Sequence, residues 1–129
     1  MSFLEYEYWR VRPGCEERHD EMIRRWFDFL TTYQAELFPE WKSARYYRQT
    51  DRDGNATGVY LMLFEYQSVA AHHAYKERRK DWSGPYAEYK LIDPYQFFEQ
   101  ETVVTEYWQP LEAGRWPEFP ATAGPSGAT

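Results

Sequence analysis

The sequence predicts one α+β domain in which strands and helices follow the order β-α-β-β-α-β. Segments rich in aromatic and β-branched residues alternate with two stretches of helical periodicity, and these patterns predict strands and helices respectively. A chain of 129 residues is too short to build two separate cores. We therefore expect one α+β domain over residues 1–108, followed by a Pro-rich C-terminal arm over residues 109–129.

The first element is a predicted strand from Phe3 to Val11, which ends at a turn-forming Pro-Gly pair. Because side chains alternate between the faces of a strand, this segment presents two different surfaces. The first surface consists of Leu4, Tyr6 and Tyr8, and the second of Glu5, Glu7 and Trp9. We expect the first surface to face the core, since the second combines carboxylates with a tryptophan.

Residues 15–38 carry the apolar periodicity of a helix that buries one side. The stripe, at spacings of three and four, consists of Met22, Ile23, Trp26, Phe27, Leu30, Tyr33 and Leu37. Acidic residues fill the first turns, where the helix dipole favours negative charge, and Pro39 ends the helix. This stripe is expected to cover one face of the sheet.

Two further strands, Trp41–Gln49 and Val59–Tyr66, are predicted to form a hairpin around the polar loop T-D-R-D-G-N-A-T-G. The second is almost entirely apolar and is expected to be a central strand covered on both faces. A second helix, with Ser68 as its N-cap, is predicted from Val69 to Trp82. Gly84 and Pro85 then interrupt the chain before a short helix over residues 86–91 and a last strand over residues 102–108.

This order of elements is a ferredoxin-like plan with an antiparallel sheet and both helices on one face. The first and third strands are expected at its centre, which leaves the other face bare. Large side chains occupy that bare face, and a second copy of the chain is the expected cover. Trp116 and Phe119 indicate that the first half of the arm is docked as well.

Composition excludes several classes of function. The net charge of −6 argues against nucleic-acid binding, which needs a concentrated basic face. With Cys15 as the only cysteine, neither an intrachain disulfide nor a cysteine-based zinc site can form within one chain. The first residues do not resemble a signal peptide, and no apolar run approaches the ~20 residues of a membrane helix. We expect a cytoplasmic protein with no membrane partner.

Three segments resemble the dimeric α+β barrel superfamily, in particular its NIPSNAP-like and antibiotic-biosynthesis-monooxygenase-like branches. They are E-Y-E-Y-W-R-V-R-P-G-C-E-E, L-F-E-Y-Q-S-V-A-A and R-R-K-D-W-S-G-P-Y. The resemblance covers residues 3–108 and implies a homodimer in which two sheets pack face to face. It also implies a small-molecule site between each sheet and its own helices. The superfamily includes cofactor-free monooxygenases, cyclases, isomerases and haem-binding proteins, so the fold does not select one activity.

The chain has three histidines, two of them adjacent. On a helix, neighbouring residues diverge, so His72 is placed at the edge of a cleft and His73 in solvent, and no metal site is predicted. His19 lies on the buried stripe of the first helix. It is either a hydrogen-bonded core residue or, if it lines a pocket, a group suited to proton transfer or haem ligation.

The remaining candidates are carboxylates and aromatic rings. Glu7 is either part of an ion pair or a general base facing an aromatic pocket. The predicted ligand-binding residues are Tyr6, Tyr8, Trp26, Tyr60, Tyr66 and Trp82, although such tyrosines also occur as plain core residues. With His19, His72 and Glu7 as catalytic candidates, we expect a cofactor-independent oxygenase, cyclase or isomerase acting on an aromatic or polyketide-like substrate. The alternatives are haem binding or degradation, and a non-enzymatic dimeric ligand-binding module.

Overall fold

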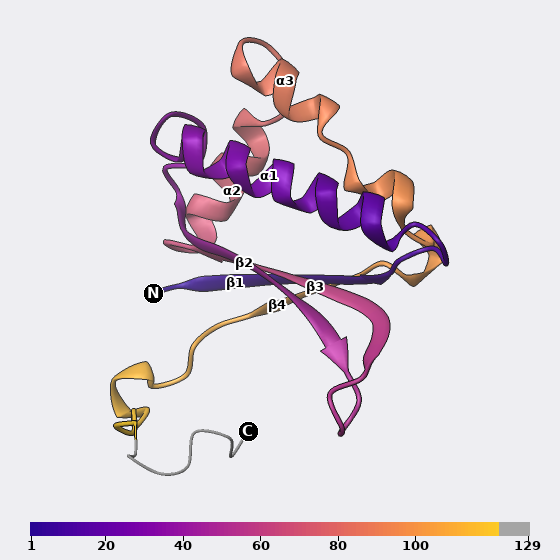
Figure 1. Cartoon of the computed structure of the whole chain (residues 1–129). Helices are drawn as coiled ribbons and strands as arrows, with labels where there is room; N and C mark the ends of the chain where they lie inside the picture. Colours follow the sequence, from indigo (N-terminus) through magenta and orange to yellow (C-terminus); the bar gives the residue numbers. More distant parts are fainter. Residues whose placement is uncertain (122–129) are drawn as a thin grey trace.

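The computed structural model describes residues 1–121 and confirms the predicted β-α-β-β-α-β order (Figure 1). The main elements are β1 (Phe3–Arg10), α1 (Glu16–Leu37), β2 (Trp41–Thr50), β3 (Ala56–Tyr66), α2 (Val69–Arg78), α3 (Pro85–Leu91) and β4 (Val104–Trp108). Short 3-10 turns, η1 (Pro94–Phe97), η2 (Gln100–Thr102) and η3 (Ala113–Arg115), complete the described chain. Residues 122–129 of the predicted arm lie outside the described part.

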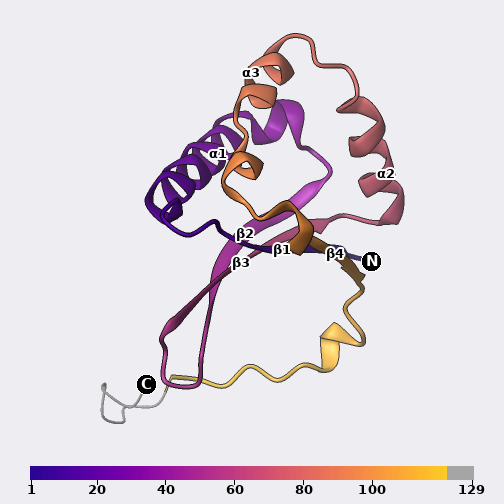
Figure 2. The same ribbon diagram turned by 90° about the vertical axis from the view of Figure 1, so that its right-hand side faces the viewer.

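The sheet is antiparallel, with the strand order β2-β3-β1-β4, so the first and third strands are central as predicted. Figure 2 shows α1 and α2 on the same side of the sheet, with α3 above them. In the described part of the chain, the other side of the sheet carries no α-helix. The expectation that β3 is covered on both faces is therefore wrong for a single chain. Within residues 1–121, no helix is long and apolar enough to cross a membrane.

The two faces of β1 are the reverse of the sequence expectation. Trp9 is 1% exposed and Glu5 is 4% exposed, and both lie under the helices. Tyr6 and Tyr8 lie on the open face and are only half-buried. A buried carboxylate needs partners. Here Tyr66 and Lys76 approach Glu5 from β3 and α2, which is why the face with carboxylates can be the inner one.

Helix α1 buries His19 with the predicted apolar residues Ile23, Trp26, Leu30 and Leu37, and adds Phe29. Helix α2 begins as predicted, because Ser68 Oγ accepts a hydrogen bond from the Ala71 backbone N–H at 3.0 Å. It ends at Arg78, four residues before the predicted end. At that point the Arg78 side chain reaches across to the end of α1, where it donates to the Leu37 carbonyl at 2.8 Å.

Candidate functional site

The sheet divides the predicted site residues into two groups on its two sides. Tyr6 and Tyr8 stand on the open face. The other predicted residues lie on the helix side or in the helical layer: Glu7, His19, Trp26, Tyr60, Tyr66, His72 and Trp82. Of these, Tyr60 also reaches the rim of the open-face hollow near the end of β3.

A group of four polar residues, three buried and one partly exposed, connects the sheet to α2, and we call it the Glu5 cluster. It consists of Glu5 on β1, Tyr66 on β3, and His72 and Lys76 on α2. The Tyr66 hydroxyl donates to Glu5 Oε1 at 3.2 Å, and Lys76 Nζ lies 3.5 Å from the same oxygen. His72 and Lys76 reach the carboxylate together because residues four apart lie on one face of a helix.

His72 is the unusual member of this cluster. The residue is 7% exposed, and neither ring nitrogen has a hydrogen-bond partner among the described residues. Its Nε2 lies 3.8 Å from Glu5 Oε2, which is too long for a hydrogen bond. Burial lowers the pKa of His72 by disfavouring the imidazolium, and the nearby Glu5 charge only partly offsets this. The ring is therefore neutral at pH 7, with a free nitrogen that can accept a proton.

Two other members of the cluster, Tyr66 and Lys76, also have shifted pKa values. Burial and the Glu5 charge raise the pKa of Tyr66, so this phenol remains a hydrogen-bond donor to the carboxylate. Burial lowers the pKa of Lys76, while the attraction of Glu5 acts in the opposite direction. A protonated Lys76 supplies the positive charge that makes a buried carboxylate tolerable.

Aromatic rings enclose His72 on the side of β4. The ring centroid of Phe3 lies 5.3 Å from that of His72, and the centroid of Tyr107 lies 5.5 Å away. Phe3 and Tyr107 also stack on each other at 5.5 Å. Tyr107 is 53% exposed and sits on an edge strand, so it separates the histidine from solvent.

Glu7 points to the same side of the sheet, two residues further along β1. The Tyr95 hydroxyl donates to its Oε1 at 2.6 Å, and the Thr105 hydroxyl donates to its Oε2 at 3.4 Å. Tyr95 also lines a small hollow of about 360 Å³ between the helices, together with Arg79 and the predicted ligand residues Trp26 and Trp82. Glu7 is therefore held by two hydroxyl groups next to that hollow.

His19 is fully buried and uses both of its ring nitrogens. Trp9 Nε1 donates to Nε2 at 3.1 Å, and Nδ1 lies 2.9 Å from Asp20 Oδ1. Burial lowers the pKa of His19, against the opposing effect of Asp20. These contacts match the core interpretation of His19, which the sequence left open beside the catalytic one.

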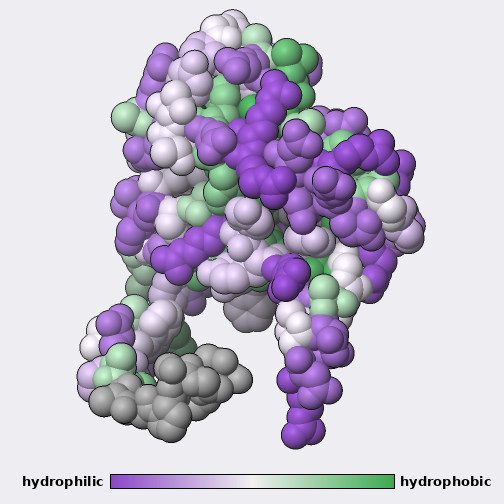
Figure 3. Space-filling view, in the orientation of Figure 1, coloured by the Kyte–Doolittle hydropathy of each residue, from purple (hydrophilic) through white to green (hydrophobic). Residues whose placement is uncertain are grey.

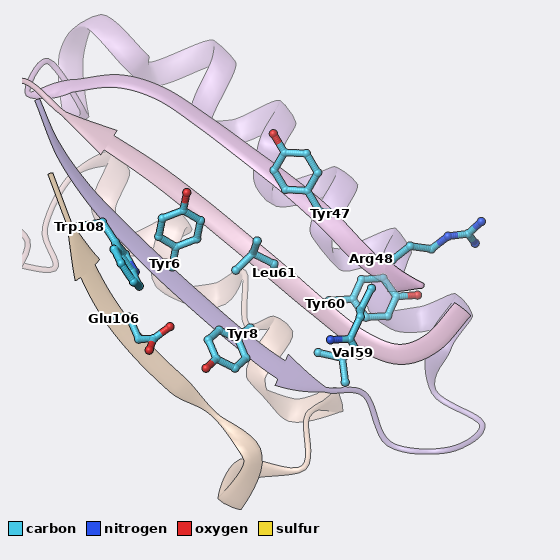
Figure 4. Close-up of a pocket in the computed structure, with 10 residues that line it drawn as sticks. Tyr6, Tyr8, Tyr47, Arg48, Val59, Tyr60, Leu61, Glu106 and Trp108 are labelled. Atoms are coloured by element: carbon cyan, nitrogen blue, oxygen red, sulfur yellow. The ribbon is translucent and has the colours of Figure 1, made fainter. Parts of the chain in front are cut away.

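The open face of the sheet carries a hollow of about 670 Å³, larger than the one between the helices. Figure 4 shows Tyr6, Tyr8, Leu61 and Trp108 standing on the sheet surface that faces away from the helices. Tyr47 from β2 and Glu106 from β4 complete the wall on either side. No histidine lines this hollow in the described chain. The open-face hollow is therefore lined mainly by aromatic side chains and contains one carboxylate.

Sequence reasoning missed several residues of both sites. Lys76 was not among the predicted site residues, although its position four residues after His72 places both on one helix face. Tyr107 and Trp108 lie on the short β4 strand, where nothing in the sequence distinguishes the two faces. Tyr47 was predicted only as a strand residue. Pairing with Leu61 on β3 is what brings it to the hollow.

Comparison with known proteins identifies the class of fold. No protein-family model and no curated protein sequence matches the chain. Among solved structures, it is similar to a NIPSNAP family protein from Agrobacterium tumefaciens, with a TM-score of 0.59 and 12% identity over 88% of this chain and 96% of that one. A protein from Bordetella bronchiseptica assigned as an antibiotic biosynthesis monooxygenase gives a TM-score of 0.60 and 14% identity over 85% and 97% of the two chains.

A third structure, a dimeric ferredoxin-like protein of unknown function from Jannaschia, has a TM-score of 0.58 and 12% identity over 85% of this chain and all of that one. The protein is thus an α+β protein of the ferredoxin-like type. The predicted resemblance to NIPSNAP and antibiotic-biosynthesis-monooxygenase proteins is confirmed at the level of fold. Sequence identities this low support a shared fold but not a shared function.

Proposed function

We propose that the protein is a homodimeric, cofactor-independent enzyme that removes a proton from an activated carbon of a small aromatic or polyketide-like molecule. Removing such a proton is a step that oxygenases, cyclases and isomerases without a cofactor can share. The observation that carries the proposal is the neutral, buried ring of His72, whose two nitrogens have no partner among the described residues. A base with a lowered pKa stays unprotonated at neutral pH.

In the proposed step, His72 Nε2 accepts the proton, and the electron pair of the broken C–H bond stays on the substrate as an enolate or phenolate. The imidazolium so formed faces the Glu5 carboxylate, whose Oε2 is 3.8 Å away. Tyr66 positions that carboxylate by donating to its other oxygen. The ammonium of Lys76 is the nearby positive charge that can stabilise the substrate anion. Returning the proton to another carbon completes an isomerisation.

The surroundings of His72 support an aromatic substrate. Phe3 and Tyr66 present their rings to the imidazole, at 5.3 Å and 4.8 Å between centroids. Tyr107, which closes the site on the third side, is half exposed on a short edge strand. A planar ligand that displaces the Tyr107 ring would stack on Phe3 in its place and bring a reactive carbon to Nε2.

Deuterium exchange tests the shared step without knowledge of the natural substrate. The protein is incubated in D₂O with 2-tetralone and with anthrone, two aromatic ketones with acidic C–H bonds, and loss of the proton signal is followed by NMR. We expect His72→Gln to lower the catalysed rate by roughly 10²-fold or more, as for removal of a general base. His73→Gln, one position along in an exposed place, is the matched control and keeps the rate. Equal rates for the wild type and His72→Gln on both ketones would contradict the proposal.

The dimer is proposed from the open face of the sheet. Tyr47 is 45% exposed there, Val104 39% and Trp108 54%, so a row of large side chains has no cover among residues 1–121 of a single chain. A second copy placed face to face would bury this row on both sheets. Light scattering of the wild type checks the assembly: a particle of 15.6 kDa at micromolar concentration would contradict it.

A second candidate function, ligand binding without catalysis, is favoured by the open-face hollow. Its tyrosine and tryptophan walls suit a flat aromatic molecule, and Glu106 offers one hydrogen-bond acceptor. Binding of the fluorescent probe 1-anilinonaphthalene-8-sulfonate distinguishes the two sites. Tyr8→Ala should weaken binding in the hollow and leave deuterium exchange unchanged, whereas His72→Gln should do the reverse. We do not propose haem binding, because both ring nitrogens of His19 are engaged inside the core and His72 Nε2 faces the Glu5 carboxylate.

A further inference from the structure

The C-terminal segment of residues 109–121, here called the arm, exposes its large apolar side chains. Leu111 is 78% exposed, Trp116 57% and Phe119 84%. We call these three residues, which lie within nine positions of the chain, the apolar strip. Single exposed apolar residues are common on protein surfaces, but several large ones close together in the chain are typical of a contact surface.

The arm keeps a definite shape without help from its own domain. Trp116 Nε1 donates to the Leu111 carbonyl at 2.7 Å, and the Arg115 backbone N–H donates to the Glu112 carbonyl at 2.8 Å. Glu112 takes a left-handed conformation with φ of 51° to make this turn. Within the described part of the arm, each hydrogen bond joins two arm residues. Because the turn already fixes the position of Trp116, little conformational entropy is lost when this side chain packs against a partner.

The path of the arm places this strip on the open side of the sheet. Strand β4 ends at Trp108, which stands on the open face, and the chain then continues below the sheet on the side without helices (Figures 1 and 2). The β2–β3 hairpin extends to the same side. Figure 3 shows the hydrophilic hairpin tip and the arm as two separate lobes below the body of the molecule. A second sheet that packs on the open face would lie between these two lobes.

We propose that each arm packs on the second copy of the chain and closes that copy's open-face hollow with Trp116 and Phe119. This inference rests on the proposed homodimer. A buried aromatic residue contributes about 150–250 Å² of contact area. Two arms would therefore add several hundred Å² to the sheet-to-sheet contact, a useful share of the roughly 1,200–2,000 Å² in a stable interface.

Charge also favours a second copy as the occupant. The arm carries the carboxylates of Glu112 and Glu118 on either side of Trp116, and with Arg115 its net charge is −1. Strand β2 places Arg45 on the open face, since it pairs with Leu63, and Arg48 lines the rim of the hollow. An arm that reaches β2 of the other copy would bring opposite charges together at the edge of the apolar contact. In this arrangement, the hollow of each copy takes part of its wall from its partner.

Site-specific cross-linking in the full-length chain tests which copy the arm touches. Trp116→p-benzoylphenylalanine is prepared in a tagged and an untagged form, the two are mixed and irradiated, and the linked peptides are identified by mass spectrometry. We expect links between tagged and untagged chains, to peptides that include Tyr8 or Leu61. Val69→p-benzoylphenylalanine, on α2 and 39% exposed, is the control and should give no such link. Links only within one chain would overturn the proposal.

Sedimentation separates this proposal from the function on which it rests. Trp116→Ala and Phe119→Ala should each raise the dimer dissociation constant by about tenfold or more, as for central interface residues. Leu91→Ala, 71% exposed at the end of α3, should leave that constant unchanged. If the wild type is a dimer and both arm variants have the same dissociation constant as the wild type, the arm contact alone is overturned. A monomeric wild type would overturn the dimer itself, and deuterium exchange reports on the catalytic proposal in either case.

Discussion

The indole N–H of Trp9 donates a hydrogen bond to Nε2 of His19 at 3.1 Å, and both side chains are buried. Because Nε2 accepts this bond, the proton of the neutral ring lies on Nδ1, which faces Asp20 Oδ1 at 2.9 Å. The ring centroids of His19 and Tyr60 are 4.5 Å apart. The histidine thus joins α1 to β1 and β3, and it has no nitrogen left to exchange protons with a ligand.

Replacing His19 should therefore affect stability before it affects chemistry. His19→Phe fills the space but leaves the Trp9 N–H buried without an acceptor, which should lower the free energy of unfolding by about 1–3 kcal/mol. His19→Gln keeps an acceptor oxygen and should cost less. Urea denaturation measures the difference. A His19→Phe protein as stable as the wild type would contradict the structural role, as would a loss of deuterium exchange in fully folded His19→Gln.

Stability should fall as the solution becomes mildly acidic. Burial lowers the pKa values of His19 and His72 in the folded state, so the unfolded chain binds protons that the folded chain does not. Above about pH 6.5, the approximate pKa of a histidine in the unfolded chain, the folded state keeps its full stability. As the pH falls below that value, the free energy of unfolding decreases by up to about 1.4 kcal/mol per pH unit for each histidine. The free energy of unfolding should be measured between pH 7.5 and 5.

The matched control for this pH dependence is the exposed His73. His73→Gln should keep the slope of the unfolding free energy against pH, whereas the double variant His19→Gln/His72→Gln should lose most of it. Retention of the full slope in the double variant would show that other groups cause it.

The sequence predicted the order of elements because each has a local cause. Ser68 caps α2, and the periodic stripe of α1 ends before Pro39. The face of β1 was assigned incorrectly because burial of Glu5 depends on Lys76 and Tyr66, which are 71 and 61 residues away in the chain. Local patterns cannot show such partners. For the same reason, the sequence could not show that the sheet separates Tyr6 and Tyr8 from the histidines.

Arg78 should be the most sensitive charged residue for stability. Its guanidinium donates to the Leu37 carbonyl at 2.8 Å and to the Tyr86 hydroxyl at 3.0 Å, and it forms a two-pronged contact with Glu40. These bonds join the end of α2 to α1 and α3. Arg78→Met keeps the aliphatic stem but removes every donor, and should cost about 2–4 kcal/mol.

An exposed ion pair nearby gives the comparison for Arg78. Lys80 lies 2.9 Å from Glu77, and both side chains are largely in solvent. Lys80→Met should therefore change the free energy of unfolding by less than about 1 kcal/mol. Similar losses for Arg78→Met and Lys80→Met in thermal and urea unfolding would show that the contact between helices is not stabilising.

Leu61 tests whether the open face is an interface. Its side chain stands in the open-face hollow, between Tyr8 on β1 and Tyr47 on β2, and makes no part of the helix-side core. Leu61→Asp should therefore leave the single chain folded. In a face-to-face dimer the new carboxylate would be buried without a partner, a penalty large enough to dissociate the two copies.

Leu91→Asp, at an exposed position on α3, introduces the same charge on the opposite side of the molecule and serves as the control. We expect Leu61→Asp to sediment as a monomer with a wild-type circular dichroism spectrum, whereas Leu91→Asp sediments as the wild type does. An unpaired carboxylate at position 61 is tolerated only if the open face stays in contact with water. If Leu61→Asp remains a dimer, the two copies therefore meet through some other surface.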